Sequence, residues 1–203
     1  MKLYDFAKDR FSKISHNGKP LVEREYQKRL CELLEDIIRT DGGRRVVINI
    51  PGGCGASLFA SQMLPAYSGL CSTIYSYSEY IARSHKRNAM RLGAENVEAS
   101  SVRKKSKRGD LVIFDNPIDP CLYEKKHENL DHLLSTQKSR AKCILIGSRR
   151  HKGDVYDLAV NNYGYERRVV FDSSLIEDDY RFGLMNLLGT DRWFAEVLQR
   201  PMT

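Results

Sequence analysis

The fold is most readily inferred from one stretch of the chain, Val46-Val47-Ile48-Asn49-Ile50-Pro51-Gly52-Gly53-Cys54-Gly55-Ala56-Ser57. Its first half is a β-branched run without regular polar alternation, which predicts a strand buried on both faces. Its second half is a turn of small residues that opens a helix, predicted over 57–64 and ended by Pro65. A turn at this place in an α/β protein can present backbone N–H groups and a helix N-terminus to an oxyanion.

We call residues 51–57 the glycine turn; its members are Pro51, Gly52, Gly53, Cys54, Gly55, Ala56 and Ser57. A complete phosphate loop also carries a lysine just before the Ser or Thr, and here that position holds Ala56. A glycine-rich connection between a strand and a helix can also be no more than a tight turn. From this segment alone, phosphate binding and a plain turn both stay open.

The rest of the chain alternates between predicted strands and helices. Four further apolar runs predict central strands, at 71–76, 111–115, 143–148 and 168–171. Helical patterns cover 26–38, 78–92, 122–136 and 154–161, and two more follow at 175–188 and 191–199. This alternation predicts a three-layer α/β fold with a mostly parallel sheet of at least five strands and two C-terminal helices. Ligands of such a sheet bind beyond the carboxyl ends of its strands.

Two of these predicted strands end in polar residues. Asp115 closes an apolar run, and in nucleotide-hydrolysing α/β proteins such an acid holds magnesium; an ordinary turn residue is the alternative. The strand at 143–148 leads into Ser148 and Arg149, whose hydroxyl and guanidinium groups could lie over a bound phosphate. The alternative there is a solvated loop with Asp154 as the N-cap of the next helix.

Length and composition limit the class of protein. The chain has 203 residues, with 41% hydrophobic and 29% charged, which predicts one globular domain and excludes wholesale disorder. No run approaches the roughly 18 to 20 apolar residues of a membrane span, and the first residues lack a signal-peptide core, so we expect a soluble intracellular protein. The chain has five cysteines and no C-x-x-C pair, so we expect no disulfides and no zinc site.

Positive charge is concentrated in one region. The chain has 33 basic and 26 acidic residues, a net charge of +7, and residues 83–108 alone carry nine basic residues against two acidic ones. Such a concentration suits contact with a phosphate backbone, and a solvated basic loop is the alternative. The candidate contacts for nucleic acid are Arg83, Lys86, Arg87, Arg103, Lys104, Lys105, Lys107 and Arg108.

Taken in order, these segments resemble the ATPase domain of the large terminase subunit, the motor that packages double-stranded DNA into tailed-phage capsids. The resemblance spreads over nearly the whole chain. The glycine turn resembles the family's phosphate loop, and residues 75–84 resemble its Ser-Tyr-Ser stretch and basic helix. Residues 109–117 are similar to its acidic motif, 148–154 to its coupling motif, and 187–201 to the helix that joins motor to nuclease.

The resemblance implies a RecA-like P-loop NTPase fold, with ATP at Pro51 to Ser57 and Mg²⁺ near Ser57 and Asp115. It places catalytic roles on Asp115, Asn116, Ser148 and Arg149. It implies an ATPase domain over 1–172, which includes an N-terminal helix, and a helical linker over 173–203. The implied partners are double-stranded DNA, a portal protein, a small terminase subunit or separate nuclease subunit, and further copies in a ring. The implied location is the host-cell cytoplasm, for a virus-encoded protein with no membrane partner.

The sequence departs from the family at catalytic positions. Gly53 replaces the loop arginine, Ala56 the lysine, and Asn116 the second acid. Losing the lysine removes about 1.5 to 3 kcal/mol of charge-assisted contact, which binding can survive. Losing the base removes a further roughly 10²- to 10⁴-fold in rate, because an amide does not accept a proton at neutral pH. We therefore expect nucleotide binding with weak or lost ATP hydrolysis.

Other interpretations remain open. The chain could be an inactive pseudo-ATPase that acts as a DNA- or protein-binding scaffold or regulator. A basic residue from elsewhere could replace the lysine; the candidates are Arg44, Arg45, Lys104 and Lys105. A third hypothesis is a small-molecule α/β enzyme with Cys54 as nucleophile, since a helix N-terminus can lower a thiol pKa. We assign no functional role to the histidines. Because the chain stops where a nuclease domain would begin, we expect no DNA cleavage.

Overall fold

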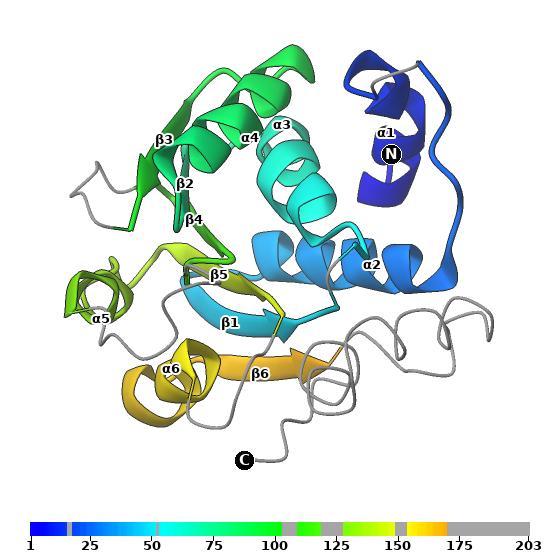
Figure 1. Cartoon of the computed structure of the whole chain (residues 1–203). Helices are drawn as coiled ribbons and strands as arrows, with labels where there is room; N and C mark the ends of the chain where they lie inside the picture. Colours follow the sequence, from blue (N-terminus) through cyan, green and yellow to red (C-terminus); the bar gives the residue numbers. More distant parts are fainter. Residues whose placement is uncertain (16–17, 52, 103–108, 119–127, 149–153, 170–203) are drawn as a thin grey trace, which may run out of the picture.

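The computed structural model describes residues 1–15, 18–51, 53–102, 109–118, 128–148 and 154–169 (Figure 1). Its centre is a six-stranded, all-parallel sheet in the order β3-β2-β4-β5-β1-β6. The strands are β1 (Arg44–Asn49), β2 (Ser72–Ser76), β3 (Val97–Ser101), β4 (Leu111–Asp115), β5 (Lys142–Gly147) and β6 (Glu166–Val169). With helices on both faces, this is the three-layer, RecA-like α/β fold that the sequence predicts.

The helices divide between the two faces of the sheet. They are α1 (Leu3–Arg10), η1 (Phe11–Lys13), α2 (Glu25–Arg39), η2 (Ser57–Met63), α3 (Leu64–Ser68), α4 (Glu79–Arg91), α5 (Glu128–Ser135) and α6 (Val155–Tyr163). One hydrophobic core joins α1, α2, η2, α3 and α4 to one face, and a second joins α5 and α6 to the other (Figure 1).

The central strands are apolar because both of their faces are covered. In β1, Val46 and Ile48 belong to the first core and Val47 to the second, and all three are fully buried. Burying one such side chain contributes about 1.5 to 3 kcal/mol, so a polar residue at these positions would be costly. This double burial is why the four predicted strands 46–50, 71–76, 111–115 and 143–148 are found within one or two residues of their expected bounds.

Two expectations about elements need correction. The helix that starts at Ser57 does not end at Pro65: it is π-helical to Met63 and then α-helical to Ser68, where Gly69 (φ +66°) closes it. Pro65 lies directly after the π-helical part, at the point where the helix becomes α-helical. The edge strand β3 was not predicted, because Glu98 and Ser100 interrupt its apolar pattern.

Several predicted segments lie outside the described residues. They are residues 122–127 of one predicted helix, residues 170–171 of the last predicted strand, the domain boundary at 172, and both C-terminal helices. Within the described ranges, none of the helices has the length and apolarity that crossing a membrane requires.

Candidate functional site

At two places in the sheet, the helices that follow two neighbouring strands lie on opposite faces. This leaves a crevice beyond the carboxyl ends of those strands. The helices after β1 and β2 (η2 and α3, then α4) pack on one face, whereas those after β4 and β5 (α5 and α6) pack on the other. Neighbouring strands β1 and β5, and likewise β2 and β4, therefore send their next helices to opposite faces. Ligands of open α/β sheets bind at such points, beyond the carboxyl ends of the strands.

The glycine turn and Asp115 meet in this crevice. Oγ of Ser57, the first residue of η2, donates a hydrogen bond of 3.0 Å to Oδ1 of Asp115, the last residue of β4. In the sheet register, Asp115 lies between Ser76 of β2 and Ile146 of β5, on the face that carries η2 and α4. Asp115 is only 1% exposed.

The shape of the glycine turn requires its glycines. Gly53 and Gly55 have φ values of +81° and +85°, which side chains other than glycine rarely adopt. A Cβ on Gly55 would also lie 3.0 Å from the ring of Phe59. Gly52 lies outside the described residues.

A cavity of about 270 Å³ borders this turn. Its lining residues are Ile50, Pro51, Gly53, Gly55, Ala56, Ser57, Leu58, Asn116, Gly147 and Ser148. Cys54, a member of the glycine turn that was predicted as part of the same site, is buried and is not among the lining residues. The turn therefore has room beside its backbone and the first turn of η2, which is where an anion would lie.

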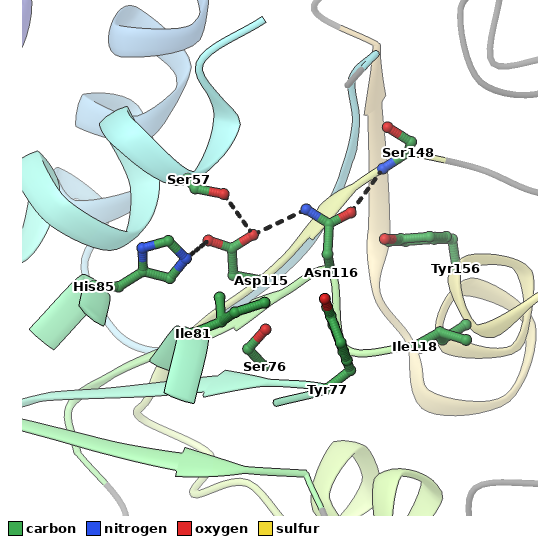
Figure 2. Close-up of a pocket in the computed structure, with 10 residues that line it drawn as sticks. All are labelled: Ser57, Ser76, Tyr77, Ile81, His85, Asp115, Asn116, Ile118, Ser148 and Tyr156. Atoms are coloured by element: carbon green, nitrogen blue, oxygen red, sulfur yellow. Dashed lines mark hydrogen bonds and ion pairs between the residues drawn. The ribbon is translucent and has the colours of Figure 1, made fainter. Parts of the chain in front are cut away.

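Both oxygens of Asp115 have several polar neighbours (Figure 2). Oδ1 accepts hydrogen bonds from Ser57 and, at 3.1 Å, from Nδ2 of Asn116. Oδ2 accepts a 2.6 Å hydrogen bond from Oγ of Ser61 and lies 3.3 Å from Nε2 of His85. Burial lowers the pKa of His85, and the Asp115 carboxylate acts on that pKa in the opposite direction.

Asn116 connects two strands. Its backbone N–H donates to the carbonyl of Ile146 at 2.9 Å, and its Oδ1 accepts from the backbone N–H of Ser148 at 3.3 Å. Its φ of +42° lies in the left-handed region, which Asn adopts more readily than other side chains. With both ends of its amide bonded to protein groups, Asn116 ties β4 to the end of β5, and an amide at this place cannot serve as a base.

Gly147 and Ser148 join the end of β5 to Ile50, the residue directly before the glycine turn. Oγ of Ser148 donates to the carbonyl of Ile50 at 3.0 Å, and the N–H of Ile50 donates to the carbonyl of Gly147 at 3.1 Å. A Cβ on Gly147 would lie 2.4 Å from Oδ1 of Asn116, so this residue must be glycine. Arg149, predicted to act beside Ser148, lies outside the described residues.

A second cavity, of about 300 Å³, adjoins the first and shares Ser57, Asn116 and Ser148 with it. Its lining residues are Ser57, Ser76, Tyr77, Ile81, His85, Asp115, Asn116, Ile118, Ser148 and Tyr156 (Figure 2). Ser76 is 1% exposed, and its Oγ has no hydrogen-bond partner among the described residues. Neither cavity has a lysine or arginine among its described lining residues.

Arg44 and Arg45 do not replace the missing lysine. They begin β1, about five strand residues from its carboxyl end, which corresponds to roughly 16 Å. Arg44 is held by Asp36 at 2.6 Å and Glu166 at 3.3 Å. Arg45 donates to the carbonyls of Tyr163 and Gln137. Lys104 and Lys105, the other two candidates, lie outside the described residues.

Cys54 lacks the properties of a nucleophile. It is 6% exposed, and burial raises its pKa to about 11, opposite to the lowering that a reactive thiol needs. The hypothesis of a cysteine-dependent enzyme therefore has no support at this site.

Arg83 and Arg87 lie on nearly the opposite side of α4 from His85, because each is two positions away from it in the helix. Arg83 and Arg87 are exposed and four positions apart, so they share one face, while Lys86 is half-buried. Arg83 also pairs with Glu79 at 2.5 Å. The remaining candidate contacts, Arg103, Lys104, Lys105, Lys107 and Arg108, lie outside the described residues.

Three residues near Asp115 were missed by the sequence analysis: Ser61, Gln62 and His85. Ser61 had a usable signal, because it follows Ser57 by four positions and so lies on the same side of a helix. His85 had none, because its approach to Asp115 depends on how α4 packs against η2. The sequence matches no family model and no curated protein.

Proposed function

We propose that this chain binds ATP with Mg²⁺ at the glycine turn and Asp115, as a terminase large-subunit-like protein of viral double-stranded DNA packaging. The observation that carries the proposal is the 3.0 Å contact between Ser57 and Asp115. In P-loop NTPases a Ser or Thr of the loop and an acidic strand end hold the magnesium ion together. The order of motifs along the chain supports the terminase assignment.

The residues present fit a magnesium ion that is shared with phosphates. Ser57 and Asp115 supply a hydroxyl and a carboxylate, and Mg²⁺ commonly takes one or two such ligands and completes its shell with phosphate oxygens and water. The cavity beside the glycine turn leaves space for those phosphates. The magnesium ion would neutralise phosphate charge, a contribution that gains weight here because Ala56 supplies none.

Hydrolysis is weak or absent in this proposal. Asn116 stands where the resemblance expects a second acid, and its amide bridges Asp115 and Ser148. The same bridge favours the alternative function, an inactive pseudo-ATPase that acts as a scaffold or regulator. In either case the exposed face of α4 and residues 103–108 are the proposed contact with DNA, in the cytoplasm of an infected host cell. A portal protein, a small terminase subunit, a separate nuclease subunit and further copies in a ring are the proposed protein partners.

Binding of a fluorescent ATP derivative tests the site. We expect Mg²⁺-dependent binding, weakened at least about tenfold by Ser57→Ala or Asp115→Ala, because each removes a cation ligand. Ser135→Ala, which removes a hydroxyl bonded to His132 on α5, is the matched control and leaves the affinity unchanged. Binding that is indifferent to magnesium and to both variants would contradict the proposal.

Turnover separates the two functions. Magnesium-dependent ATP hydrolysis by the wild-type chain, lost in Asp115→Ala, would exclude the pseudo-ATPase. If the wild type is silent, the double variant Ala56→Lys with Asn116→Asp decides between a decayed motor, which regains turnover, and a scaffold, which does not.

A further inference from the structure

A histidine from a helix that is distant in sequence lies beside the carboxylate oxygen of Asp115 that Ser57 does not contact. His85 belongs to α4, and its Nε2 lies 3.3 Å from Oδ2 of Asp115. Ser61 donates to the same oxygen at 2.6 Å, from the second turn of η2. Oδ2 therefore accepts from Ser61 and lies beside His85, while Oδ1 accepts from Ser57, the other proposed cation ligand, and from Nδ2 of Asn116. Figure 2 shows His85 on one side of the carboxylate and Ser57 and Asn116 on the other.

The orientation of the His85 ring is itself held. Nε2 of Gln62 lies 3.1 Å from Nδ1 of His85, and an amide nitrogen only donates, so Nδ1 accepts and the ring proton lies on Nε2. That proton faces the carboxylate of Asp115. Oε1 of Gln62 in turn accepts from Nδ2 of Asn88 at 3.1 Å, which fixes the amide and links η2 to α4.

The contacts of His85 and Ser61 with Asp115 are buried, which strengthens them. The side chains of His85 and Asp115 are 13% and 2% exposed, and Ser61 is fully buried, so water screens these contacts little. A carboxylate held on one oxygen can offer the other in a fixed direction. Partners of this kind, behind a metal ligand, commonly change metal affinity 10- to 100-fold when they are removed.

We propose that His85 is a positioning residue: together with Ser61 it fixes Oδ2 of Asp115, so that Oδ1 beside Ser57 faces the cation of the bound nucleotide. This inference rests on the proposed function, since it concerns the same magnesium site. It adds a requirement that the Ser57–Asp115 pair alone does not make: the cation site needs α4 to be packed on η2. A purely structural role would change the stability of the chain and leave its magnesium requirement unchanged.

The test is a Mg²⁺ titration of binding of the fluorescent ATP derivative, with wild type, Ser61→Ala, His85→Leu and His85→Gln. The leucine removes the N–H donor at similar volume, whereas glutamine keeps a donor at the end of the side chain. We expect His85→Leu and Ser61→Ala each to raise the Mg²⁺ concentration for half-maximal binding about tenfold. His85→Gln should stay within about threefold of wild type.

A second readout needs no nucleotide. Long-range proton–nitrogen NMR of the His85 ring reports which nitrogen carries the proton, and we expect Nε2. A proton on Nδ1 alone would overturn the proposal, because Nε2 would then present no donor to Asp115.

The outcomes of the titration are separable. Suppose that His85→Leu and Ser61→Ala leave the magnesium requirement unchanged, while Asp115→Ala weakens nucleotide binding. This result overturns the positioning role of His85 and leaves the proposed function standing. Wild-type protein that binds no nucleotide with magnesium overturns both. If His85→Leu does not fold, Ser61→Ala decides, since it removes a single buried hydroxyl.

Discussion

Oδ1 of Asn116 accepts a hydrogen bond from the backbone N–H of Ser148, while Nδ2 of the same amide donates to Asp115. An amide can accept on one side and donate on the other in this way, whereas an ionised carboxylate at position 116 would accept only. Asn116 therefore connects Asp115 to the end of β5 through its side-chain amide. The first prediction follows from this bridge.

Asn116→Asp should destabilise the protein when no metal is present. The change removes a hydrogen bond and places a second carboxylate beside Asp115, which together cost about 1 to 3 kcal/mol. Urea unfolding without metal measures this loss, and Mg²⁺ should restore part of it by binding between the two carboxylates. Asn161→Asp, at an exposed position of α6, is the control and should change the unfolding free energy by less than about 0.5 kcal/mol. Equal stability of Asn116→Asp and wild type would mean that the bridge contributes nothing.

The basic face of α4 is predicted to contact DNA. Arg83→Glu combined with Arg87→Glu should weaken binding to duplex DNA of any sequence and reduce the slope of log affinity against log salt by about one per lost phosphate contact. Fluorescence anisotropy at several salt concentrations measures both quantities.

Lys28→Glu combined with Arg29→Glu is the matched control for this pair. It makes the same change in charge on α2, where both residues lie near Glu25. Equal losses in the two double variants would indicate a response to net charge and no contact at α4.

Cys54 is predicted to be unreactive in the folded protein. With a pKa of about 11, about one thiol in a thousand is ionised at pH 8, and the side chain is buried as well. A Cys121→Ser chain treated with a thiol-specific reagent at pH 8 should react rapidly at the exposed Cys71 only, and Cys54 should react after unfolding. Rapid labelling of Cys54 in the double variant Cys71→Ser with Cys121→Ser would revive the nucleophile hypothesis.

The fold could be predicted from sequence because the sheet is buried on both faces. A run such as Leu111–Asp115 has to be apolar at every position except its end, which makes it visible without any knowledge of its neighbours. The edge strand Val97–Ser101 is only partly covered and carries polar residues, so its pattern did not distinguish it from a loop.

The site was only partly predictable for a different reason. The glycine turn and Asp115 each lie at a strand end, and parallel strands bring such ends to one edge. The approach of His85 depends instead on the packing of α4 against η2, which no local spacing records. Arg44 and Arg45 were candidates to replace the missing lysine. They lie at the amino-terminal end of β1, away from the glycine turn, and the sequence alone did not give this position.

The most direct measurement locates the cation. Mn²⁺ bound in place of Mg²⁺, in the presence of ATP, broadens the NMR signals of nearby backbone amides. If Ser57 and Asp115 hold the ion, the amides of Gly53, Ser57 and Asp115 should lose intensity first, and those of Arg44 and Arg45 at the other end of β1 should lose it only at higher Mn²⁺. Broadening that spares Ser57 and Asp115, or that appears at another edge of the sheet, would contradict a nucleotide site at the glycine turn.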